Sequence, residues 1–114
     1  MTYNAKIKLY QKISGRSPVE EFLSECSNEI RQDFLDALTL LIDGVRLSMP
    51  LSRNLSNIHP GLIELRLKDR SGQIRVFYFM KKNDGIYMLH AFKKKIQELP
   101  RHEIETVLKR IKEV

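Results

Sequence analysis

Residues 62–92 read LIELRLKDRSGQIRVFYFMKKNDGIYMLHAF, and this stretch decides the fold. Its apolar runs are short and rich in leucine, β-branched and aromatic residues, which is typical of strands. They cover residues 62–68, 74–80 and 86–92. The intervening sequences, Asp69–Gly72 and Lys82–Gly85, carry the Asp, Asn, Ser and Gly residues of tight turns. Because so short a connection can join only antiparallel neighbours, we predict an antiparallel meander.

The first half of the chain predicts a strand followed by helices. Apolar residues alternate with polar ones over residues 3–10, at Tyr3, Ala5, Ile7 and Leu9, which indicates a half-buried strand. Ser17-Pro18-Val19-Glu20 and Ser27-Asn28-Glu29 are helix starts, and an apolar stripe at helical spacing leads to Gly44. Residues 17–44 are therefore two helices, or one helix with a break.

The rest of the chain completes an α+β pattern. Residues 46–61 contain Pro50, Pro60 and Gly61 and predict a loop, whereas Pro100 opens a final helix. We expect a small antiparallel or mixed sheet of about four strands, with the two early helices packed on one face. The other face would then stay open, and an aromatic residue such as Phe77 or Phe79 would offer a partner protein an apolar surface there.

Length and composition restrict the function classes. The 114 residues predict one domain spanning 1–114. The sequence lacks an apolar run near 18 residues and a secretory signal, so we expect a cytoplasmic protein without a membrane span. A single cysteine cannot staple the fold, and the three histidines lack a nearby second ligand, so neither a metal nor another cofactor is expected.

Positive charge is concentrated in the second half of the chain. Residues 1–59 hold 7 basic and 7 acidic side chains, whereas residues 60–114 hold 13 basic and 7 acidic ones, which accounts for the whole net charge of +6. A basic region of this kind favours a polyanionic partner, most often a nucleic acid. A merely solvated surface is the plain alternative.

Strand alternation gathers much of this charge on the open face. If Ile63, Leu65 and Leu67 face the core, then Glu64, Arg66 and Lys68 share the opposite face. Arg75, in the next strand, and the Lys93–Lys95 run at the end of the third can join them. Glu64 would pair with Arg66 or Arg75, and His90 is either part of the site or a satisfied core histidine.

Such a cluster suits RNA cleavage without metal. The ribose 2′-hydroxyl attacks the adjacent phosphorus, and the protein moves protons and stabilises the charge on the phosphorane. Crowded cations lower the pKa of a lysine, so Lys68 or Lys94 could transfer a proton near neutral pH. An arginine cannot do so and would serve as an electrostatic clamp.

Several motifs carry a family resemblance. The chain resembles the phage-derived HigB-like toxins of the RelE/ParE superfamily, which belong to type II toxin–antitoxin systems. The similar segments are Gly15-x-Ser17-Pro18-Val19-x-Glu21-Phe22-Leu23, Gly61-Leu62-Ile63-Glu64-Leu65-Arg66, Arg75-Val76-Phe77-Tyr78-Phe79, and Leu89-His90-Ala91-Phe92-x-Lys94-Lys95 with Pro100 and Glu103-Ile104.

The resemblance implies a RelE-like fold and an endoribonuclease that cuts messenger RNA in the ribosomal A site. It implies that Arg66 and Lys68 hold the substrate and take part in catalysis, and that Arg75 and Lys94 contact the scissile phosphate. Lys93, Lys95 and Arg70 would add RNA-binding charge. It also implies a cognate antitoxin, often a HigA-like helix-turn-helix protein, with operator DNA bound only through the complex.

One departure from the family pattern concerns the proton-transfer group. RelE itself has a tyrosine near the C-terminus, and this chain has none after Tyr87. His90 or His102 could substitute, and we include His90 among the candidate catalytic residues. Two other functions stay open: a ParE-like inhibitor of DNA gyrase, and an inactive prophage-derived remnant that binds nucleic acid.

Overall fold

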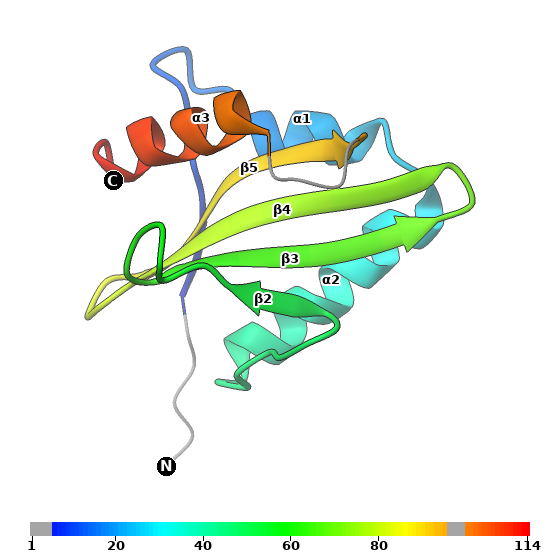
Figure 1. Ribbon diagram of the computed structural model, residues 1–114, viewed down its shortest axis with the longest axis horizontal. Helices are drawn as coiled ribbons and strands as arrows, with labels where there is room; N and C mark the ends of the chain where they lie inside the picture. Colours follow the sequence, from blue (N-terminus) through cyan, green and yellow to red (C-terminus); the bar gives the residue numbers. More distant parts are fainter. Residues whose placement is uncertain (1–5, 96–99) are drawn as a thin grey trace.

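The computed structural model describes residues 6–95 and 100–114 (Figure 1). Along the chain the elements are β1 (Ile7–Leu9), α1 (Pro18–Ser24), α2 (Asn28–Ile42), β2 (Ser52–Asn54), β3 (Leu62–Asp69), β4 (Gly72–Lys81), β5 (Gly85–Lys94) and α3 (Arg101–Ile111). The α+β class and the β3–β4–β5 meander are confirmed. Of the predicted first strand, Tyr3 and Ala5 lie outside the described residues.

Within the described part of the chain the sheet has five strands, in the order β1-β5-β4-β3-β2. The edge strand β1 runs parallel to β5, and every other neighbouring pair is antiparallel. Strand β2 was not predicted, because Ser52–Asn54 is three polar residues after Pro50. It forms only because β3 offers an edge with which Ser52 pairs opposite Leu65.

The helices begin and end where the sequence signals predict. The Ser17 hydroxyl accepts a hydrogen bond from the Glu20 N–H at 3.3 Å, and Pro18 occupies the first turn of α1. The Ser27 hydroxyl caps α2 in the same way by accepting from the Ile30 N–H at 3.1 Å. Gly44, with φ of 85°, follows the end of α2, a backbone geometry that glycine adopts without strain. The break at residues 25–27 therefore separates two capped helices.

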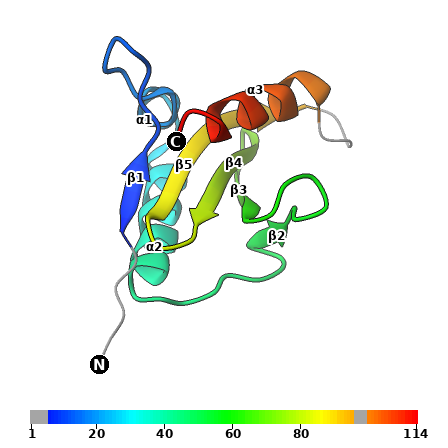
Figure 2. The same cartoon turned by 90° about the vertical axis from the view of Figure 1, so that its left-hand side faces the viewer.

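Two hydrophobic cores lie on the two faces of the sheet. The first joins α1 and α2 to the inward residues of the meander, among them Leu65, Leu67 and Val76. The second joins α3, through Val107 and Ile111, to Phe77 and other residues of the opposite face. In Figure 2, α1 and α2 flank one side of the sheet and α3 crosses near β5. The described helices therefore cover one face and part of the other.

This second core corrects the expectation of an apolar partner surface on the open face. Phe77 is completely buried, and its ring lies 5.5 Å from that of Phe92 in the core beneath α3. Phe79 packs at the edge of the same core and contacts the His59 ring edge-on. The aromatic residues of β4 thus hold the protein's own last helix.

We expect Phe77→Ala to lower the free energy of unfolding by about 3–5 kcal/mol, because it leaves a cavity between β4 and α3. Leu35→Ala is the matched control, since Leu35 is 54% exposed on α2 and its loss should change stability by less than about 0.5 kcal/mol. Urea denaturation measures both. Equal, small losses in the two variants would contradict the second core.

Candidate functional site

Three rows of side chains cross the sheet on the face opposite α1 and α2. Reading from β3 through β4 to β5, the register aligns Lys68, Gln73 and Lys94 in the first row. It aligns Arg66, Arg75 and Phe92 in the second, and Glu64, Phe77 and His90 in the third. Because aligned residues share a face, cations from all three strands come together at the end of the meander. We call Arg66, Lys68, Arg75 and Lys94 the basic site.

The carboxylate of Glu64 lies within this arrangement and has no exposed surface. Its Oε1 accepts a hydrogen bond from Arg66 Nε at 3.0 Å, and its Oε2 lies 3.7 Å from Arg75 Nε. The alternation had placed Glu64 on this face as a cross-strand partner of an arginine. Its complete burial, which makes the pair far more consequential than an exposed one, was not predicted.

Arg75 is held by neighbours on its own strand as well. The guanidinium donates from Nη2 to Gln73 Oε1 at 2.6 Å and from Nη1 to the Ile74 carbonyl at 3.3 Å. The residue is only 6% exposed. Burial lowers the pKa of Arg75, Glu64 opposes that shift, and neighbouring Arg66 adds to it. Arg75 is thus a fixed positive charge at the floor of the site.

Lys94, at the end of β5, has the perturbed proton affinity that acid–base chemistry uses. Burial and then the charge of Arg75 lower its pKa, whereas Glu64 raises it. Arg66 and Arg53 lower it further. A lysine whose pKa is lowered in this way can release its proton closer to neutral pH than an isolated lysine.

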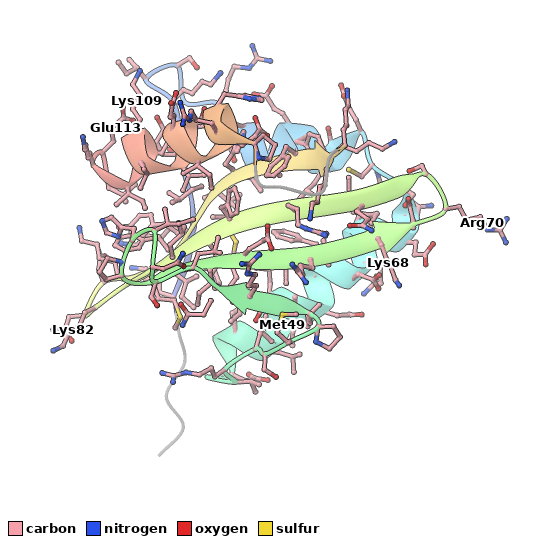
Figure 3. The ribbon with its side chains drawn as sticks, in the orientation of Figure 1. Met49, Lys68, Arg70, Lys82, Lys109 and Glu113 are labelled. Atoms are coloured by element: carbon pink, nitrogen blue, oxygen red, sulfur yellow. The ribbon has the colours of Figure 1, made fainter. Side chains whose placement is uncertain are left out.

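The basic site borders a hollow of about 340 Å³. Arg66, Lys68, Gln73 and Arg75 line it together with Pro50, Leu51 and Leu67, from the segment before β2 and from β3. Arg66 Nη1 also lies 3.9 Å from the sulfur of Met49, whose position beside the sheet is shown in Figure 3. The hollow therefore combines cationic and apolar walls.

The remaining predicted RNA-binding residues do not join the hollow. Lys93 aligns with Ile74, whose side chain lies in the core with α1 and α2, so Lys93 belongs to the other face. Lys95 is exposed just beyond β5, and Arg70 projects from the β3–β4 turn (Figure 3). Treating Lys93–Lys95 as one group overlooked the alternation that separates Lys93 from Lys94.

His90 is on the face of the basic site, but α3 occupies both of its ring nitrogens. Nε2 lies 3.2 Å from Glu103 Oε2, and Nδ1 lies 3.2 Å from Arg110 Nη1. Because an arginine can only donate, Nδ1 accepts and Nε2 carries the proton given to Glu103. The same Arg110 nitrogen donates to the Leu89 carbonyl at 2.7 Å. His90 therefore fastens α3 to β5 and has no ring nitrogen left for a substrate.

His102 lies at the start of α3 and is exposed. Its Nε2 lies 2.9 Å from Glu103 Oε1, and 79% of its side chain is accessible. Glu103 thus bridges the two histidines, one half-buried and one at the surface. Neither histidine lines the hollow beside the basic site.

Sequence reasoning missed two polar neighbours of the basic site. Arg53 aligns with Glu64 across the β2–β3 pair, and its strand was not predicted. Gln73 accepts a hydrogen bond from Arg75 and aligns with Lys94, but a glutamine after a turn carries no functional signal in the sequence.

No metal-binding group of three or more His, Cys, Asp or Glu side chains occurs among residues 6–95 and 100–114. No helix in that part of the chain is long and apolar enough to cross a membrane.

The fold and the site define a class of small α+β protein with a basic site on a half-covered sheet face. The family model of the phage-derived Gp49-like proteins (DUF891) matches residues 21–112, and the chain belongs to this family. The match contains all four residues of the basic site. Gp49-like proteins are associated with RelE/HigB-like toxins. Among curated proteins, none matches the sequence.

The His90 contacts predict how stability depends on pH. Burial lowers the pKa of His90, the charge of Glu103 opposes this, and Arg110 and His102 contribute further lowering. The folded state therefore binds a proton less readily than the unfolded state, so stability falls as pH drops below about 6.5. His90→Gln should flatten the fall in melting temperature between pH 7 and pH 5. His102→Gln is the exposed control, and an equal flattening there would contradict the assignment.

Proposed function

We propose that this protein is the toxin of a type II toxin–antitoxin system and cleaves messenger RNA on the ribosome without a metal ion. The observation that carries the proposal is the basic site, in which three strands bring Arg66, Lys68, Arg75 and Lys94 to one face of the sheet, the first three of them lining one hollow. Guanidinium and ammonium groups are the natural ligands of a phosphate backbone. Membership of a toxin-associated phage family supports the same function.

The cleavage step requires charge stabilisation at phosphorus. As the 2′-oxygen bonds to phosphorus it gives its proton to solvent water, the bond to the 5′-oxygen breaks, and the non-bridging oxygens of the phosphorane gain negative charge. Arg66, 23% exposed at its side chain, is the accessible guanidinium, and Arg75 supplies a buried positive charge behind it. Preorganised cations of this kind cost no reorganisation when the charge develops. The products are a cyclic phosphate and a free 5′-hydroxyl.

Proton transfer falls to Lys94 in this proposal. Its ammonium group protonates the departing 5′-oxygen, and its lowered pKa makes the proton available. Lys68, exposed in the same row of the sheet, binds a flanking phosphate. His90 is not in the proposed catalytic set, because Glu103 and Arg110 engage its ring.

The proposal assigns substrate positioning to the ribosome. The hollow is lined by cations and apolar residues, and the described residues that line it include no histidine or carboxylate that would remove the 2′-proton. A site that supplies a general acid and an electrostatic clamp but only a weak base depends on a well-aligned substrate. Such alignment can lower a reaction barrier by about 7–11 kcal/mol. The cognate antitoxin would be a helix-turn-helix protein, and both would act in the cytoplasm.

Lys68→Ala and Lys94→Ala should each slow messenger RNA cleavage on ribosomes by about 10²-fold or more, because each removes a cation that contacts the substrate. Lys82→Ala is the matched control: Lys82 is an exposed lysine at the opposite end of the sheet from Lys68 (Figure 3). Primer extension on messenger RNA after induction, with purified protein and ribosomes as a second assay, measures the effect.

Arg75→Ala is a poorer test, because it leaves the buried Glu64 carboxylate without its partner and should destabilise the fold by about 3–5 kcal/mol. Wild-type cleavage by both lysine variants would contradict the proposed site. Growth arrest with intact messenger RNA and inhibited gyrase would replace the nuclease with a ParE-like function. Unaffected growth together with uncut RNA in the ribosome assay would indicate an inactive remnant.

The lowered pKa of Lys94 predicts the pH profile of cleavage. A general acid must be protonated, so the rate should fall as pH rises through its pKa, which lies below the ordinary lysine value of 10.5. Lys94→Arg should remove this alkaline limb, because the guanidinium stays protonated. Single-turnover cleavage between pH 7 and pH 10, corrected for the reaction without protein, measures the profile. An unchanged limb in the arginine variant would assign the proton to another group.

A further inference from the structure

We propose that Glu64 is a positioning residue: its buried carboxylate orients the guanidinium groups of Arg66 and Arg75 for the phosphate. The inference rests on the proposed nuclease function and adds a member to the machinery of the same site. Glu64 touches no substrate in this proposal and transfers no proton. It acts through the two arginines.

A carboxylate is energetically costly at the place that Glu64 takes in the fold. Arg53 and Arg66 adjoin it on two sides, but Phe77 on β4 and Leu62 on β3 adjoin it on the others, and both are completely buried. Replacing a buried ion pair by well-packed apolar side chains is often neutral or stabilising. Apolar residues at positions 64 and 75 together would therefore serve the fold at least as well, and stability alone does not explain the buried ion pair.

The two contacts of the Glu64 carboxylate are both made at the Nε atom of an arginine. Glu64 Oε1 takes the Nε–H of Arg66 at 3.0 Å, and Oε2 faces the Nε of Arg75 at 3.7 Å. A guanidinium group is planar, so holding that of Arg66 at Nε fixes its plane and leaves its terminal nitrogens for another acceptor. One carboxylate thus sets the orientation of an accessible arginine and of a buried one.

The contact between Glu64 and Arg75 is incomplete. Glu64 Oε2 and Arg75 Nε are both buried, and neither has a hydrogen-bond partner within residues 6–95 and 100–114. Buried polar atoms are almost always satisfied, so an unsatisfied pair marks a place where something other than stability determines the arrangement. Gln73 and the Ile74 carbonyl accept hydrogen bonds from the terminal nitrogens of Arg75, so its guanidinium lies between its own strand and Glu64.

Positioning and simple electrostatics predict opposite results when the charge of Glu64 is removed. Glu64 is a buried negative charge on a face that carries Arg53 on β2, Arg66 and Lys68 on β3, Arg75 on β4 and Lys94 on β5. If its charge only weakened the positive field, its removal would tighten RNA binding and leave cleavage unchanged or faster. If it orients the arginines, RNA binding stays the same or tightens while cleavage slows.

The test compares Glu64→Gln and Glu64→Asp with the wild-type protein. Asp33→Asn is the matched control, because it removes one negative charge from an exposed position on α2. Binding is measured with an RNA that carries a 2′-deoxy sugar at the cleavage position, and cleavage in single turnover with the unmodified RNA on ribosomes. We expect Glu64→Gln to bind at least as tightly as wild type and to cleave about 10²-fold more slowly, a loss typical of misplaced catalytic groups.

Glu64→Asp separates charge from reach, since it keeps the carboxylate but shortens the side chain by one methylene group. Positioning predicts slow cleavage in this variant as well, together with an unchanged affinity, and Asp33→Asn should match wild type in cleavage. Wild-type cleavage rates in both Glu64 variants would overturn the proposal. A loss of RNA binding parallel to the loss of cleavage would also overturn it.

A readout that needs no RNA keeps this inference distinct from the proposed function. The Nε–H resonances of Arg66 and Arg75 report directly on the carboxylate contact in ¹⁵N-labelled protein. They should shift in Glu64→Gln and stay in place in Asp33→Asn, with thermal melting confirming that each variant is folded. Unchanged resonances in Glu64→Gln would overturn the positioning role, whereas shifted resonances in a protein that cuts no RNA would overturn only the nuclease function.

Discussion

The alternation of side chains along three antiparallel strands is the constraint on which the rest of the molecule depends. In β3, β4 and β5 one set of residues must enter the core beneath α1 and α2, and the other set must appear on the second face. The register then decides which of those second-face residues stand beside each other. It brings Arg66 opposite Arg75 and aligns Lys68 with Lys94 through Gln73. Like charges are held together because the hydrophobic layer behind them leaves no other register open.

A buried negative charge inside the sheet partly balances the positive charge of the basic site. Glu64 is completely buried, yet it lies within 4 Å of two guanidinium groups, and its charge opposes the lowering of the Lys94 pKa. The cations of the site therefore differ from one another in burial and in proton affinity. Arg75 is buried and fixed, Arg66 is partly accessible, and Lys94 combines partial exposure with a lowered pKa. That division matches what phosphoryl chemistry asks of a protein, namely fixed charge beside a movable proton.

The last helix limits how much of the second face is available. Helix α3 covers Phe77, and its Glu103 and Arg110 take both ring nitrogens of His90. The histidine that would be the obvious proton-transfer group is thereby turned into an anchor between β5 and α3. The basic site lies on the portion of the face that α3 leaves uncovered, beside the hollow bordered by Pro50 and Leu51. Helix α3 thus covers one part of this face, and the cations of the basic site occupy the uncovered part.

Local signals in the sequence were sufficient for much of this structure. The turn sequences at Asp69–Gly72 and Lys82–Gly85 and the caps Ser17 and Ser27 act over a few residues, so the meander and the helix starts could be read directly. The same alternation placed Arg66, Lys68 and Arg75 on a common face. The alternation also predicts that Lys93 and Lys94 lie on opposite faces of the sheet. Because Lys93–Lys95 is a run of identical residues, this difference was overlooked.

The tertiary structure alone decided the contacts between residues that are far apart in the chain. Strand β2 exists because β3 provides an edge, Glu64 is buried between its neighbours on β2 and β4, and His90 is engaged because Arg110 comes back to it from α3. None of these partners is close in sequence to the residue it affects. Short-range patterns determine what each segment can form, whereas burial and pairing energies arise only when distant segments meet.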